Sequence, residues 1–138
     1  MEAQTVIARR IALELKDGML VNLGIGIPTM VANYVPQGMH VFFQSENGLI
    51  GTGPIADGAM VQARLTDAGG RPVTAIPGAC TFDSAISFGL IRGGHVDMIT
   101  LHGRRRAQIL VVRRMQFVRI FYEHAHFRVV GRATAKVG

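Results

Sequence analysis

Apolar residues recur along the first hundred residues with helical and strand spacing in turn, which predicts an alternating order of elements. Ile7, Ile11 and Leu15, for example, repeat at the spacing of one helix face. In chain order the predicted elements are a helix ended by Asp17-Gly18, a strand over 19–23, a helix from Pro28 to about Tyr34, a strand over 40–44, an irregular loop over 48–71, a strand over 72–76, a turn over 77–79, a helix from Asp83 or Ser84 to Gly93-Gly94, and a strand over 96–101.

This alternation predicts an α/β fold with an open, mostly parallel sheet and helices on its faces, because consecutive parallel strands need a crossover between them. In such a sheet the carboxyl ends of the strands meet at one edge, where ligands bind. Three loops containing glycine are therefore expected to gather there, namely 22–26, 45–48 and 77–79.

Glu46 is the single carboxylate among these loops, directly after the buried pattern Val41-Phe42-Phe43. Asn47-Gly48 supplies residues that tolerate the left-handed conformation of a sharp turn. A carboxylate at this edge, surrounded by glycine loops that expose backbone N–H groups, suits an anionic or carbonyl-bearing substrate. The alternative is a solvent-exposed glutamate in an ordinary turn. Gly24-x-Gly26 lacks the third glycine of a dinucleotide fingerprint, so it predicts a tight turn and not a nucleotide site.

Composition predicts a globular chain of one common domain size, since 138 residues include 49% hydrophobic and 17% charged residues. The single cysteine, Cys80, suits a reducing compartment, and the charged N-terminal helix argues against a secretory signal. We therefore expect a cytoplasmic protein without a membrane span.

The net charge of +6 is unevenly distributed. Residues 1–101 contain six basic and eight acidic side chains, whereas residues 102–138 contain nine basic side chains and Glu123 alone as an acid. This predicts two compositional segments, 1–101 and a basic tail over 102–138. The aromatic residues between the arginines of the tail permit base stacking, so a protein that binds nucleic acid or acidic surfaces without catalysis is the alternative function.

The first segment resembles the B subunit of 3-oxoacid CoA-transferases, including the acetate/acetoacetate and succinyl-CoA:3-oxoacid types. The resemblance covers about residues 8–101 and rests on order and spacing as well as on the motifs themselves. These motifs are Asn22-Leu23-Gly24-Ile25-Gly26-Ile27-Pro28, Gln44-Ser45-Glu46-Asn47-Gly48-Leu49-Ile50-Gly51, Pro77-Gly78-Ala79, Phe82-Asp83-Ser84, Ser87-Phe88 and Ile91-Arg92-Gly93-Gly94-His95.

The resemblance implies that Glu46 is a nucleophile that forms a glutamyl-CoA thioester while CoA moves between an acyl-CoA and a carboxylic acid. It implies no metal and no organic cofactor, with coenzyme A as a substrate, and it implies an A-subunit partner in a hetero-oligomer. The residues it places at the substrate and CoA site are Asn22, Gly24, Gly26, Asn47, Gly48 and Gly78.

The resemblance ends where the charge changes. Family members continue with a stretch containing Ala-Asn-Trp and a Met-Gly-Gly-Ala-Met-Asp loop, and neither follows residue 101 in this sequence, which has no tryptophan. The mixture of arginine and apolar residues over 109–122 has no clean period of 2 or 3.6. We interpret residues 102–138 as a weakly packed tail of non-family sequence, typical of a shifted reading frame. We therefore expect a truncated fold and impaired activity.

Overall fold

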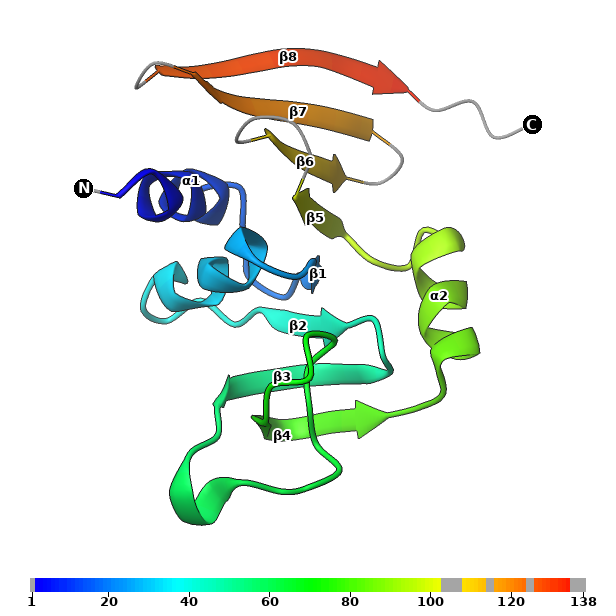
Figure 1. The fold of residues 1–138 in the computed structure, drawn as a ribbon. Helices are drawn as coiled ribbons and strands as arrows, with labels where there is room; N and C mark the ends of the chain where they lie inside the picture. The colour runs from blue at the N-terminus through cyan, green and yellow to red at the C-terminus, as the bar shows by residue number, and fades with distance from the viewer. Residues whose placement is uncertain (1, 103–107, 114–115, 124–125, 135–138) are drawn as a thin grey trace.

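The computed structural model describes residues 2–102, 108–113, 116–123 and 126–134, and it describes side chains up to Leu101. Within these ranges an open sheet of eight strands has the order β4-β3-β2-β1-β5-β6-β7-β8 (Figure 1). The elements are α1 (Ala3–Ala12), β1 (Leu20–Leu23), the 3₁₀ helix η1 (Ile27–Tyr34), β2 (Phe42–Ser45), β3 (Leu49–Ile55), the 3₁₀ helix η2 (Gly58–Met60), β4 (Val73–Thr81), α2 (Ser84–Arg92), β5 (Met98–His102), β6 (Gln108–Arg113), β7 (Gln116–Glu123) and β8 (His126–Thr134).

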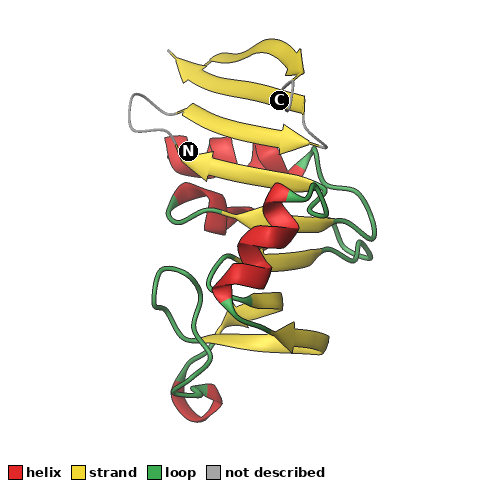
Figure 2. Cartoon of the chain, turned by 90° about the vertical axis from the view of Figure 1, so that its right-hand side faces the viewer, coloured by secondary structure: helices red, strands yellow, loops and turns green. Residues whose placement is uncertain are grey.

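The centre of the sheet is parallel, since β1 pairs in parallel with both β2 and β5. The helices α1 and η1 lie on one face of the sheet and α2 lies on the other (Figures 1 and 2). The predicted α/β class, with an open sheet and helices on its faces, is confirmed, and the predicted mostly parallel arrangement holds for the core of the sheet. Antiparallel strands flank this centre on both sides, with β3 and β4 beyond β2 and with β6, β7 and β8 beyond β5.

The core lies between α1 and the central strands. Ile7 and Ile11 are at most 2% exposed and pack in one cluster with Val21, Phe43 and Met98. These three strand residues occupy equivalent register positions in β1, β2 and β5, so they face the same side of the sheet. The helical spacing of the apolar residues therefore predicted the buried face of α1 correctly.

The end of α1 differs from the prediction, because the helix ends at Ala12 and not at Asp17-Gly18. Two tight turns follow, in which Glu14 N–H donates to the Ile11 carbonyl and Leu15 N–H donates to the Ala12 carbonyl. These turns still bury Leu15 in the core. Gly18, at φ +76°, instead forms the entry to β1 and donates its N–H to the His40 carbonyl at 2.7 Å.

The segment after Glu46 was predicted to be irregular, but it contains β3. The strand could not be recognised in the sequence, because Gly51, Gly53 and Pro54 are residues typical of turns. The glycines are needed because β4 approaches closely. A Cβ on Gly51 would lie 2.8 Å from the Ala79 Cβ, and a Cβ on Gly53 would lie 2.4 Å from the Thr74 hydroxyl oxygen.

Helix α2 begins with a side-chain cap, since the Asp83 carboxylate accepts a hydrogen bond from Ile86 N–H at 2.8 Å. We expect Asp83→Ala to lower the free energy of unfolding by about 1 kcal/mol, because it leaves a donor at the helix start without a partner. Asp57→Ala is the matched control, since Asp57 precedes η2 without capping it through its side chain. Urea denaturation of both variants measures this difference, and equal losses would contradict the role of the cap.

Strands β6, β7 and β8 continue the sheet beyond β5 through antiparallel pairings. No strand was assigned over these residues from the sequence, because arginines interrupt the apolar period. Their side chains lie outside the described set, so weak packing of residues 102–138 stays a prediction. Among the helices that the structure describes, none has both the length and the apolar character needed to cross a membrane.

Candidate functional site

The loops after β1 and β2 lie at one edge of the sheet, because these two strands are parallel neighbours. Asn22 of β1 pairs in register with Gln44 of β2. Gly24 and Glu46 each come two residues after this pair, so they leave the sheet at the same level. Strand β4 runs in the same direction as β2, since each is antiparallel to β3. Its carboxyl end, where Phe82 begins the link to α2, therefore reaches the same edge as Glu46.

Glu46 is the first residue of the three-residue connection between β2 and β3, and it is half-buried. Gly48 closes this turn by donating its N–H to the Ser45 carbonyl at 3.0 Å, and its carbonyl accepts the Phe82 N–H at 2.9 Å. Within the described residues, no hydrogen bond or ion pair engages the Glu46 carboxylate. The carboxylate is thus held at the sheet edge by its backbone and is available to a ligand.

Buried polar side chains lie beneath α2, close to this turn. Gln44 Nε2 donates to the Ser87 hydroxyl oxygen at 3.0 Å and to the Ser87 carbonyl at 3.3 Å, and both residues are at most 1% exposed. Asn22 lies beside Gln44 in the register and is also 1% exposed. Its Nδ2 has no partner among the described residues. Such an unpaired buried donor is costly unless a ligand or water satisfies it.

The two predicted glycines after β1 have different structural reasons. Gly24 donates its N–H to the Thr100 carbonyl, and a Cβ there would lie 2.7 Å from that oxygen. Gly26 adopts φ +93° at the start of η1, and no atom lies within 4 Å of the position of its Cβ. Gly24 therefore fixes the contact between β1 and β5, whereas the space beside Gly26 is open.

The third predicted loop is not a loop, so the expected turn at Pro77-Gly78-Ala79 is wrong. Gly78, at φ +86°, lies within β4. The register passes from Ile50 opposite Cys80 to Thr52 opposite Ala75, so the residues between form a bulge against Gly51. A bulge needs the same left-handed glycine as a turn, which explains the error. The β4 residues at the edge beside Glu46 are Thr81 and, after it, Phe82.

A segment that the sequence did not single out, residues 66–71, lies across the β2–β3 turn, and we call it the strap. Asn47 Nδ2 donates to the Thr66 carbonyl at 2.8 Å, and Ala68 N–H donates to the Ser45 hydroxyl oxygen at 2.7 Å. Asp67 accepts bonds from the Arg71 side chain at 2.8 and 2.9 Å, which closes the strap on itself. The strap therefore packs against the residues on both sides of Glu46.

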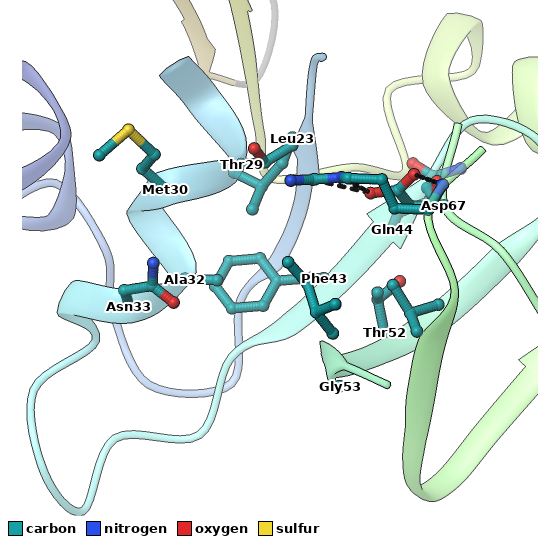
Figure 3. Close-up of a pocket in the computed structure, with 14 residues that line it drawn as sticks. Leu23, Thr29, Met30, Ala32, Asn33, Phe43, Gln44, Thr52, Gly53 and Asp67 are labelled. Atoms are coloured by element: carbon teal, nitrogen blue, oxygen red, sulfur yellow. Dashed lines mark hydrogen bonds and ion pairs between the residues drawn. The ribbon is translucent and has the colours of Figure 1, made fainter. Parts of the chain in front are cut away.

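A cavity of about 130 Å³ lies between η1, β2, β3 and the strap (Figure 3). In Figure 3 the ring of Phe43 points from β2 toward Ala32 of η1. None of the predicted site residues lines this cavity, but Gln44 and Ser45, immediately before Glu46, do. Asp67 and Arg71 also line it and were missed. The stretch Asp67-Ala68-Gly69-Gly70-Arg71 was the only available signal. It predicts a turn but does not show where in the fold that turn lies.

The arginine and aromatic side chains of residues 102–138 lie outside the described side chains. The alternative function in nucleic-acid binding therefore stays a prediction.

Comparisons with known proteins support the predicted resemblance. The family model described as "Coenzyme A transferase" matches residues 4–109, a little beyond the residue 101 at which the resemblance was expected to end. The chain is 56% identical over 103 residues to the beta subunit of acetate CoA-transferase from Escherichia coli, covering 75% of this chain and 46% of that protein. It is 52% identical over 102 residues to the B subunit of a probable succinyl-CoA:3-ketoacid coenzyme A transferase from Bacillus subtilis, covering 74% and 47%.

A third relative is the B subunit of the succinyl-CoA:3-ketoacid coenzyme A transferase from Helicobacter pylori, 53% identical over 102 residues, with 74% of this chain and 49% of that protein covered. The chain thus spans about half the length of the curated relatives it matches. The matched residues include every strand and helix that forms the edge around Glu46. The family match and these identities show that the chain belongs to the coenzyme A transferase family, and that it is similar to the B subunits, as its motifs predicted.

Proposed function

We propose that this chain is the nucleophile-bearing part of the B subunit of a CoA-transferase, and that Glu46 is the nucleophile. One observation carries the proposal: a half-buried glutamate follows a parallel strand at the carboxyl edge of the sheet, without a partner for its carboxylate among the described residues. The substrates would be an acyl-CoA and a short-chain or 3-oxo carboxylic acid, consistent with the names of the relatives.

In the proposed reaction the Glu46 carboxylate attacks the thioester carbonyl, and the C–S bond breaks to release CoA thiolate and an acyl-glutamyl anhydride. The thiolate then attacks the glutamyl carbonyl, which forms the Glu46–CoA thioester and releases the first carboxylate. A second carboxylate reverses both steps. The bonds made and broken are equivalent in number and type, so this route requires no metal and no organic cofactor.

The remaining predicted site residues have roles that suit this chemistry. The developing oxyanion needs donors in a water-poor site, each worth roughly 10²–10³ in rate. Asn22 Nδ2 is a buried donor without a partner among the described residues, which supports its proposed place in that environment. The open space at Gly26 and the turn at Asn47-Gly48 would allow the thioester to approach the backbone closely. We propose that Gly78, in the bulge of β4, contributes to the shape of the pocket that binds substrate and CoA.

We propose an A-type subunit as the partner, in a hetero-oligomer, because the relatives are named as subunits. We also propose that the protein acts in the cytoplasm, where the exposed free thiol of Cys80 would stay reduced. The 138 residues as written are proposed to be impaired, since the family loop Met-Gly-Gly-Ala-Met-Asp does not occur in them.

The test is a search for the covalent intermediate. Residues 2–101 are placed in a full-length B subunit, which is paired with its cognate A-type partner and incubated with acyl-CoA without acceptor. We expect mass spectrometry to find CoA attached to the peptide that contains Glu46, and Glu46→Gln to lose the adduct. Glu14→Gln, in the tight turn between α1 and β1, is the control and should keep the adduct. An adduct that persists in Glu46→Gln would remove Glu46 from this role.

A further inference from the structure

The cavity beneath the strap is lined by apolar and polar side chains together, and most of its surface is apolar. Its apolar walls come from three strands and a helix, through Leu23 of β1, Met30 of η1, Phe43 of β2 and Val73 of β4. A space of about 150 Å³ holds a molecule as large as benzene. The volume of about 130 Å³ therefore has room for a hydrocarbon chain of about five carbons.

One polar atom of a residue lining this cavity, the Thr52 hydroxyl oxygen, has no partner among the described residues. At the strap, Arg71 binds Asp67 through Nε and Nη2 only. Its Nη1 has no partner within the described residues and remains available to an anion.

The cavity leads toward the edge that carries Glu46. A smaller hollow of about 20 Å³ extends to Ile25 and Gly69, and it shares five lining residues with the cavity, namely Leu23, Thr29, Ser45, Asp67 and Arg71. Ile25 lies between the two predicted site glycines, and the strap is close to it, since a Cβ on Gly69 would lie 3.8 Å from Ile25 Cγ2. Ser45 is the residue before Glu46. The two hollows together thus connect the cavity with the loops that follow β1 and β2.

We propose that this cavity binds the hydrocarbon chain of the carboxylic acid substrate and sets its length. The carboxylate of the acid lies at the mouth, beside Ser45 and Arg71, and the chain extends inward past Thr52. The role of this cavity in substrate selection rests on the proposed function. Binding of a short-chain carboxylate to the cavity does not, because it needs neither acyl-CoA nor the nucleophile.

The experiment uses the full 138-residue chain labelled with ¹³C at its methionine methyl groups, with Met30 assigned through Met30→Leu. Acetate, butyrate, hexanoate and octanoate are titrated in turn, and the Met30 methyl shift gives each dissociation constant. Burial of each methylene corresponds to about a fourfold gain in affinity. We expect this gain to continue to about five chain carbons and then to stop, because the cavity is full. A Met30 methyl chemical shift that does not change with any of the four acids would overturn the proposal.

Ala32→Leu tests the location, since Ala32 lines the cavity and a leucine adds three carbons to that wall. The dissociation constant of hexanoate should rise at least about tenfold, while that of acetate changes little. Ala85→Leu, exposed on α2 across the sheet, is the control and should leave the series unchanged. A chain-length series unaffected by Ala32→Leu would place the acids elsewhere. Neither binding experiment depends on the covalent adduct at Glu46. A failure of the proposed cavity and a failure of the proposed nucleophile can therefore be distinguished.

Discussion

Replacing Gly48 by alanine is expected to lower the free energy of unfolding by about 3 kcal/mol or more, a large share of the stability of an ordinary domain. Two effects combine at this residue. Its φ of +116° is a conformation that residues with a side chain rarely adopt, and a Cβ there would lie 1.9 Å from the Phe82 carbonyl oxygen. That oxygen belongs to the backbone leading into α2, so it cannot move aside as a side chain would.

Gly38→Ala separates the two effects. Gly38 also has a positive φ, +82°, but no atom lies within 4 Å of the position of its Cβ. It should therefore show only the conformational cost, about 1 kcal/mol. Urea denaturation measures the loss of unfolding free energy in both variants. In thermal denaturation the Gly48 variant should unfold roughly 10 °C below the parent. Equal losses in the two variants would mean that the contact between the β2–β3 turn and Phe82 does not constrain the fold.

The second large effect concerns activity: the 138-residue chain, paired with a cognate A-type subunit, is expected to exchange CoA at least about 100-fold more slowly than a full-length relative. The proposed nucleophile is present, together with the turn that holds it. By resemblance, however, the Met-Gly-Gly-Ala-Met-Asp loop contributes to the oxyanion and CoA site, and the sequence lacks it. Loss of one oxyanion donor alone costs about 2.7–4 kcal/mol of transition-state stabilisation.

The measurement compares initial rates with acetoacetate or acetate and a short acyl-CoA, using the same A-type partner for this chain and for the full-length relative. A chimera that joins residues 1–101 to the C-terminal half of the relative is the positive control and should restore turnover. If the 138-residue chain itself reached the usual enzymatic range of about 1–10³ per second, residues 102–138 would have to replace the missing loop.

Much of the candidate site could be predicted because it depends on local sequence. The parallel strands β1 and β2 are short apolar runs, each followed by residues that suit a turn, so the position of Glu46 at a strand end followed directly. The strap could not be predicted in the same way. Its contact with Ser45 and Asn47 joins residues about twenty positions apart, through hydrogen bonds whose partners no local pattern identifies.

The sequence by itself determined the α/β class, the buried face of α1 and the family, and it narrowed the cap of α2 to Asp83 or Ser84, because periodicity, capping and motif spacing are local properties. Only the tertiary structure decided the role of the glycines between Leu49 and Thr81. Gly51 and Gly78 look like turn residues, yet they belong to β3 and β4. The physical reason is close approach: two antiparallel backbones at a bulge leave no room for a Cβ on Gly51, and Gly78 needs a positive φ.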